Sequence, residues 1–197
     1  MSSEKIVFEQ QIMSVRNLTS IHQYLIVNAT AMDASLLLRS EYVLIVSAFD
    51  SYLHSVVRRK IRENFFTSQF LPDNLNLPIT DYLAIHNESD IGIKQQLLDA
   101  TLRKCLQKDS YQSPLSVEYA LNLINIRNIW RTSATAFGDT AENIKRRLAL
   151  IIQRRNQIAH ESDIDPTGIQ RGITQQTVDD CRDFFDQFVS VIDALII

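Results

Sequence analysis

The sequence predicts an all-α protein: a bundle of four to six helices with an irregular insert in the middle of the chain. Apolar residues recur at spacings of three and four through most of the 197 residues, which is typical of helices and not of strands. The four glycines and four prolines fall between the periodic segments. This length and a hydrophobic content of 45% indicate one domain with a substantial core, spanning residues 1–197.

The first third is predicted as two helices. Residues 4–32 have apolar positions at helical spacing and a modest polar face, as expected of an outer helix. Residues 33–64 follow, with Asp33 in the position of an N-cap. The stretch 42–53 is apolar nearly all round, which indicates burial on several sides. Asp50 is then a charge in apolar surroundings, which is costly unless the carboxylate is paired.

The middle of the chain is less regular. Residues 65–92 carry prolines, asparagines and an Asn-Glu-Ser-Asp cluster, and form the predicted insert. A structureless loop of that length is uncommon in a compact domain, so one or two short elements are expected there, with 80–86 (TDYLAIH) the best candidate. Helical spacing returns over 93–106 and again over 115–137, which is predicted as one helix with Trp130 as a packing residue.

The last third is predicted as two more helices. Asp139 and Glu142 have the spacing of a capping box, which opens a helix that runs to His160. A linker over 162–172 holds a proline and two glycines, and a final helix runs from about Thr174. The chain ends on Ala-Leu-Ile-Ile, which is too apolar for a free tail and is expected either to dock in the core or to complete a subunit interface.

One charged residue lies on the apolar stripe of the helix that ends at His160. Arg155 follows Ile151 and Ile152 by four and three positions. An arginine on such a stripe needs an anionic or carbonyl partner, or else the stripe faces a cleft or a second subunit. Asp50 is the expected partner if the two helices pack together.

The charge is unevenly distributed. A formal net charge of −3 argues against a wide basic surface for nucleic acid. Residues 144–160 nevertheless hold five basic residues and no acidic one, whereas residues 161–197 hold eight acidic and two basic residues. This asymmetry fits either an RNA footprint or basic and acidic helices lying side by side. The basic residues of the first run are Lys145, Arg146, Arg147, Arg154 and Arg155, and a second run contains Arg58, Arg59, Lys60 and Arg62.

Several other chemistries have no support in the sequence. Cys105 and Cys181 occupy apolar positions and are predicted as small core residues, as two lone thiols of a reducing cytosol. No signal peptide or membrane span is expected. There is no glycine-rich phosphate loop, and neither a metal nor a cofactor is expected. Asp50 and His54 share a helix face, but two ligands are too few for a metal, and a local helix pair is the commoner meaning of that spacing.

The most informative stretch is the end of the basic helix. Arg155, Asn156 and His160 place a permanent cation, an amide and an imidazole within about a turn and a half of helix. An arginine can bind a phosphate through two contacts, and an imidazole can move protons near neutral pH. Without further context, an arginine five residues before a helix-terminal histidine is more often chance or helix capping.

Two strings supply that context. Arg155-Asn156-x-x-x-His160 resembles the signature of the HEPN superfamily, small helical domains of prokaryotic nucleotide-binding and RNA-cutting systems. The wider string RRNQIAHESD is similar to the RiboL-PSP-HEPN branch or a related one. Upstream, YVLIVSAFDSYLHSVV (42–57) resembles the hydrophobic helix of that branch, with Asp50 and a following aromatic residue and histidine. Residues from about 65 to 138 match nothing familiar.

The resemblance implies metal-independent RNA cleavage by transesterification, by a toxin or an anti-phage defence effector. It implies that His160 transfers protons, that Arg155 balances charge on the phosphoryl oxygens, and that Asn156 orients the histidine or the phosphate. Asp50 would hold Arg155 in place, with His54 also in a supporting role. The residues expected to bind the RNA backbone are Lys145, Arg146, Arg147 and Arg154.

The resemblance also implies a homodimer in which two copies of the motif face each other, acting on RNA in the cytoplasm. A partner protein such as an antitoxin is a further expectation. Two other interpretations stay open at this point. Many HEPN-like domains bind RNA or a protein without cutting, and the chain could be a plain helical interaction module. The intact Arg-Asn-x-x-x-His string favours catalysis.

Overall fold

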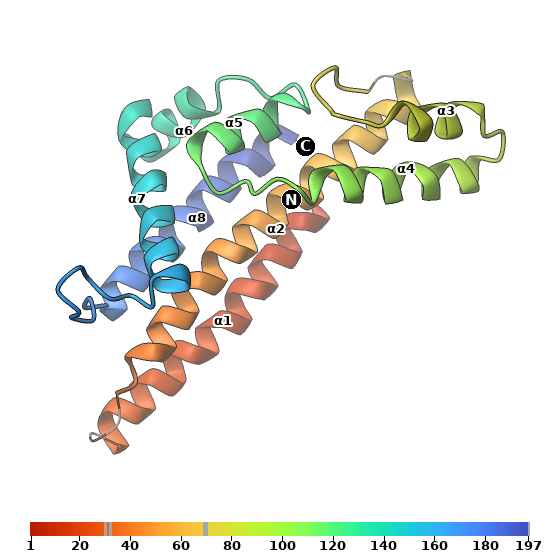
Figure 1. Cartoon of the computed structure of the whole chain (residues 1–197). Helices are drawn as coiled ribbons and strands as arrows, with labels where there is room; N and C mark the ends of the chain where they lie inside the picture. The colour runs from red at the N-terminus through yellow and green to blue at the C-terminus, as the bar shows by residue number, and fades with distance from the viewer. Residues whose placement is uncertain (30, 32, 69–70, 197) are drawn as a thin grey trace. The chain divides into compact units, whose positions relative to one another are not determined.

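The computed structural model describes residues 1–29, 31, 33–68 and 71–196. Within these ranges the chain forms eight α-helices and no β-strand apart from one isolated bridge between Ile164 and Gln170 (Figure 1). The all-α prediction is confirmed. A short helix in the central insert and a break inside residues 115–137 account for the number of helices.

The chain groups into two compact units. Unit 1 contains residues 1–52 and 128–197, and unit 2 contains residues 53–127. Helix α2 (Ser35–Ser68) runs through the boundary and contributes its first half to unit 1 and its second half to unit 2. The prediction of one domain over residues 1–197 stays a prediction. The candidate motif belongs entirely to unit 1.

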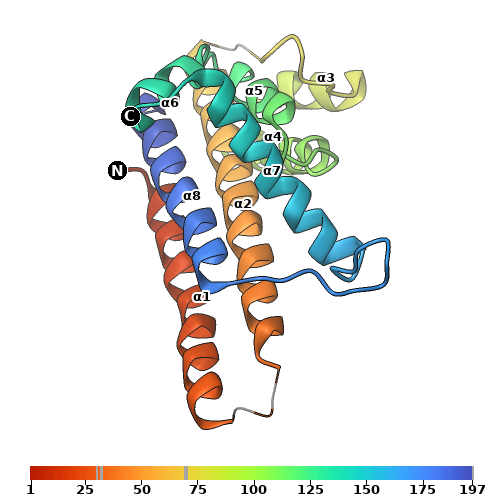
Figure 2. The same ribbon diagram turned by 90° about the vertical axis from the view of Figure 1, so that its left-hand side faces the viewer.

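Unit 1 is built from α1 (Ser3–Asn28), the first half of α2, α6 (Ile129–Phe137), α7 (Ala141–His160) and α8 (Gln175–Ile196). Helices α1 and α8 lie side by side, and α6 packs against both α7 and α8 (Figure 2). The predicted end of the first helix at Met32 lies outside the described residues. Asp33 precedes α2 and accepts a hydrogen bond from the backbone nitrogen of Ser35 at 2.9 Å.

Aromatic residues form the centre of the unit 1 core. The Phe49 ring on α2 stacks on Phe185 of α8, with ring centroids 4.6 Å apart. Trp130 is buried and stacks on Phe188 at 5.8 Å, so the prediction of a packing role for this tryptophan is confirmed. At the apolar end of the chain, Ile196 is buried in unit 1, whereas Ala194 and Leu195 are exposed, so docking in the core holds for Ile196.

Unit 2 consists of the second half of α2 with α3 (Ile79–Asn87), α4 (Ile91–Leu106) and α5 (Pro114–Asn122). Helix α3 confirms the short element predicted at 80–86, and it packs against α4. The basic run of α2 is engaged by acidic neighbours. Asp99 of α4 forms ion pairs with Arg58, Arg62 and Arg103, and Glu63 with Arg59 and Lys60.

Two details of helix termination differ from the predictions. Residues 115–137 are not one helix: α5 ends at Asn122 and α6 begins at Ile129, because Asn125 and Asn128 adopt a positive φ that an α-helix does not allow. Asparagine enters this region more readily than most residues, and periodicity alone does not reveal it.

The helix that carries the motif is also capped differently. The N-cap of α7 is Thr140, whose side chain accepts from the backbone nitrogen of Asn143. Asp139 accepts from the backbone nitrogen of Thr140 and from the side chain of Asn143. The prediction that Asp139 is the N-cap, with Glu142 as its capping-box partner, is therefore wrong, because the N-cap is one residue later.

Two further residues differ in placement. Gly92 lies in the first turn of α4 and not before it. Cys105 is only half-buried, so its prediction as a core residue is wrong, whereas Cys181 is buried as predicted.

Candidate functional site

The candidate site lies at the C-terminal end of α7. Ile144, Leu148, Ile151 and Ile152 are buried and fix which side of this helix faces the core of unit 1. Asn156 and His160 lie on the exposed side, and Arg155 is half-buried between the two sides. The helix ends directly after His160, which puts the imidazole at an open helix end.

The three motif residues meet there. Arg155 donates from Nη1 to Oδ1 of Asn156 at 3.1 Å, and the same nitrogen lies 3.4 Å from Nε2 of His160. The Nε of Arg155 is buried and makes no hydrogen bond with the described part of the chain. The structure therefore brings the predicted arginine, amide and imidazole into one cluster, with one guanidinium N–H group still lacking an acceptor.

Nε2 of His160 faces the Arg155 guanidinium. A guanidinium has only donors, so this contact is a hydrogen bond in the tautomer whose Nε2 carries no proton. The lone pair of Nε2 is the group that a general base uses. A permanent cation next to an exposed base is an arrangement suited to phosphate chemistry.

The two predicted supporting residues lie on α2. Asp50 is half-buried in unit 1, and its pairing with Arg155 stays a prediction. His54 follows one turn later and belongs to unit 2. Its ring stacks on the buried ring of Tyr111, with centroids 4.3 Å apart, which gives this histidine a packing contact within its own unit.

The predicted RNA-binding residues at the start of α7 have different environments. Lys145 lies over the ring of Trp130, with its Nζ 5.7 Å from the centroid. Arg147 lies over the ring of Phe184 at 5.1 Å and donates to the backbone oxygen of Asp180. Arg146 is exposed, and its described contact is a hydrogen bond to the Asn143 side chain at 2.9 Å. Arg146 and Arg147 are both exposed, and Arg147 is the one engaged by an aromatic ring and a backbone oxygen.

Arg154, the fourth predicted RNA-binding residue, makes its contacts inside unit 1. It binds both carboxylate oxygens of Asp163, and its Nη2 also donates to the backbone oxygen of Gly172 at 3.0 Å. Asp163 is fully buried and receives a second guanidinium, from Arg39 of α2, at 2.7 Å. The role of Arg154 in RNA binding stays a prediction, but much of its donor capacity is used by Asp163.

The sequence analysis missed this cluster of Arg39, Arg154 and Asp163. Arg39 lies 124 positions before Asp163, and no local pattern links two residues at that separation. The available signal was Arg39 itself, a cation three residues before the stretch 42–53 that is apolar nearly all round. This arginine needs a carboxylate partner, but the sequence alone does not say which carboxylate that is.

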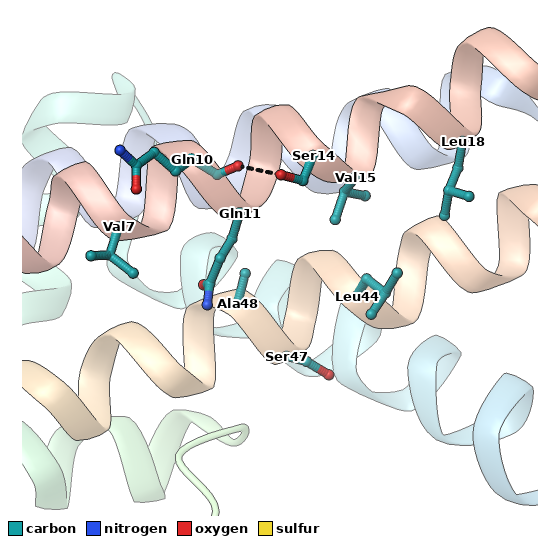
Figure 3. Close-up of a pocket in the computed structure, with 9 residues that line it drawn as sticks. All are labelled: Val7, Gln10, Gln11, Ser14, Val15, Leu18, Leu44, Ser47 and Ala48. Carbon is teal, nitrogen blue, oxygen red and sulfur yellow. Dashed lines mark hydrogen bonds between the residues drawn. The ribbon is translucent and has the colours of Figure 1, made fainter.

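A separate groove lies between α1 and the first half of α2 (Figure 3). It has a volume of about 550 Å³, and Val15, Leu44 and Ala48 are among its apolar lining residues. The described residues that line it include none from the motif. Among the described residues, no group of three His, Cys, Asp or Glu side chains could hold a metal ion.

A comparison with protein families gives a match that includes the motif residues. The model of the RiboL-PSP-HEPN family matches residues 14–197. The chain belongs to the RiboL-PSP-HEPN family. The match extends through the middle of the chain, where the sequence analysis found no resemblance. Membership in this HEPN family suggests an RNase or another nucleotide-related function.

Neither a curated protein nor a solved structure matches the chain. None of the described helices is long and apolar enough to cross a membrane.

Proposed function

We propose that this RiboL-PSP-HEPN protein is a metal-independent endoribonuclease that cleaves RNA by transesterification, as a toxin or an anti-phage defence effector. The observation that carries the proposal is the cluster at the end of α7, in which the guanidinium of Arg155 lies 3.4 Å from Nε2 of His160. The reaction needs both kinds of group: a permanent cation for the phosphate, and an imidazole that can exchange a proton with the substrate.

The proposed reaction begins when Nε2 of His160 takes the proton from the ribose 2′-hydroxyl. The 2′-oxygen then attacks the adjacent phosphorus, and the bond from phosphorus to the 5′-oxygen breaks. The products are a 2′,3′-cyclic phosphate and a 5′-hydroxyl end, and the leaving oxygen takes a proton from His160 of a second copy. Arg155 binds the phosphoryl oxygens as their charge increases, while Asn156 fixes the guanidinium through the contact of 3.1 Å.

A homodimer with a composite site is part of the proposal. Leu150 is 58% exposed on α7, about three turns before His160, although the opposite side of that helix is buried. Burying this leucine against a second copy would place the exposed side of α7 in the dimer interface, on the helix that carries the motif. Light scattering at micromolar concentration should give the mass of a dimer, and a monomer would exclude the composite site.

RNA binding in this proposal uses the cations at the start of α7. Exposed Arg146 contacts the RNA backbone, and Lys145 and Arg147 add to the local positive charge. Arg146→Ala should therefore weaken RNA binding in a salt-dependent way and leave the cleavage step unchanged.

The deciding experiment measures cleavage of RNA in excess EDTA. We expect wild-type activity to persist, and both His160→Ala and Arg155→Ala to lose about two to four orders of magnitude in rate. Arg155→Lys should also fail largely, because an ammonium cannot make the two-point contact of a guanidinium. At saturating RNA, Arg146→Ala is the matched control, since it removes a cation from the same helix outside the motif and should change RNA binding without changing the rate of cleavage.

The chemistry of the ends separates this proposal from others. Products with a 2′,3′-cyclic phosphate and a 5′-hydroxyl are expected. Ends with a 3′-hydroxyl and a 5′-phosphate, or a requirement for added magnesium, would refute the mechanism. RNA binding without cleavage would instead support a non-catalytic module. Growth arrest on expression, relieved by a co-purifying protein, would identify a toxin with its antitoxin.

A further inference from the structure

We propose that Arg39, Arg154 and Asp163 form a positioning cluster that holds the end of α7 so that Arg155 and His160 stay aligned. The inference rests on the proposed function, because it assigns these three residues to the same site. They do not contact the reacting atoms in this proposal, and act by fixing the backbone on both sides of the motif.

The cluster is built around one buried carboxylate. Asp163 is fully buried, and Arg39 is 5% exposed. Arg154 reaches both oxygens of the carboxylate, and its second contact, from Nη2 to Oδ2, measures 2.9 Å. Arg39 donates from Nε to Oδ2 of the same carboxylate at 2.7 Å. Two cations on one buried anion form a rigid junction, since each contact is charge-assisted and the carboxylate itself is shielded from water.

The two arginines also bind the returning chain. Arg39 donates from Nη2 to the backbone oxygen of Arg171 at 2.7 Å, and Arg154 donates to that of Gly172 at 3.0 Å. The backbone nitrogen of Arg171 in turn donates to the backbone oxygen of Asp163 at 2.8 Å. The loop between α7 and α8 is therefore fastened to both α7 and α2 at this one point.

Two residues of the cluster flank the motif in the sequence, Arg154 before it and Asp163 after it. Arg154 immediately precedes Arg155, so the direction of its side chain into the cluster fixes the rotation of the last turns of α7. Asp163 comes three residues after His160, and its backbone nitrogen donates to the oxygen of Gln157 at 2.9 Å. A change at the carboxylate is thus transmitted to the residues between them, which include Arg155 and His160.

The backbone after His160 supports the same conclusion. Ser162 and Asp163 have φ values of 53° and 57°, a left-handed conformation that few non-glycine residues adopt. A strained conformation of this kind is stable only where the contacts of the surrounding structure hold it in place. Here the contacts are those of the Asp163 side chain, which hold the chain in a sharp reversal directly after the imidazole.

A buried ion cluster could also contribute only to stability, so the test needs a readout that stability alone does not move. Arg39→Met is the main variant, because Arg39 contacts Asp163 and the loop and touches none of the motif residues in its described contacts. Arg182→Met is the matched control. Arg182 is an arginine of α8 that pairs at 3.6 Å with Glu41, another fully buried carboxylate of unit 1.

The experiment measures kcat and KM for RNA cleavage at a temperature at which circular dichroism shows every variant folded. Arg39→Met should lower kcat about 10- to 100-fold and change KM less than about twofold, because a small misalignment of catalytic groups has an effect of this size. Arg39→Lys should recover part of kcat, since its ammonium can still reach Asp163. Arg182→Met should lower the melting temperature and leave kcat within about twofold of wild type.

Hydrogen exchange of the segment 155–161 gives a second readout that does not depend on activity. Exchange there should become faster in Arg39→Met and stay unchanged in Arg182→Met. Wild-type kcat and exchange in Arg39→Met would overturn the positioning role while leaving the RNase proposal intact. A wild-type protein that fails to cleave RNA would overturn the proposed function, and the exchange comparison would then decide whether the cluster positions this segment.

Discussion

Replacing Asp163 with alanine should cause a large loss of stability. The substitution removes the one carboxylate shared by Arg39 and Arg154, and leaves two guanidinium groups close together in the interior of unit 1. Removing one partner of a buried ion pair typically costs about 3–5 kcal/mol, because the remaining charge is left without compensation. Asp163 compensates two charges, but Arg154 is partly accessible and can recover some hydration, so we expect a value within this range.

The corresponding change in melting temperature is measurable. For a chain of this length, about 1 kcal/mol corresponds to roughly 2–4 °C, so Asp163→Ala should melt about 6–20 °C below wild type. Thermal denaturation followed by circular dichroism, with urea denaturation in the same buffer, gives both quantities.

The control is Glu161→Ala, two positions earlier. Its carboxylate is exposed and lies 3.7 Å from Arg171, so the variant should change the free energy of unfolding by less than about 1 kcal/mol. A melting temperature for Asp163→Ala within about 2 °C of wild type would refute the reasoning that this carboxylate compensates buried charge.

Three further outcomes are expected. If Asp50 pairs with Arg155, Asp50→Ala should destabilise by about 3–5 kcal/mol, and a double-mutant cycle with Arg155→Ala should show coupling; a melting curve like that of wild type would exclude the pair. Burial raises the pKa of Cys181 to about 12, so this thiol stays protonated at pH 8. A disulfide reagent should therefore modify half-buried Cys105 before Cys181 in the native protein. Burial also raises the pKa of the Glu41 carboxyl above its ordinary value of 4.5, so the folded state favours the protonated form, and stability should fall as the pH rises from 4.5 through the raised pKa; a Glu41→Gln variant with the same pH slope as wild type over that range would contradict this.

The sequence by itself determined the all-helical fold, the family and the motif. These properties depend on local spacing: apolar residues three and four apart define helix faces, and Arg155, Asn156 and His160 come within reach of one another on a single helix. The short helix α3 was likewise predictable, because its apolar residues are near neighbours in the chain.

The tertiary structure decided which partners the charged residues have. Arg154 looked like one more member of a basic run, yet its side chain binds a buried carboxylate that also holds Arg39, from a helix more than a hundred residues earlier. Local periodicity carries no information about such pairs, since they depend on which helix faces meet. The break between α5 and α6 was hidden for a related reason: the positive φ of Asn125 and Asn128 interrupts a helix without changing its apolar spacing.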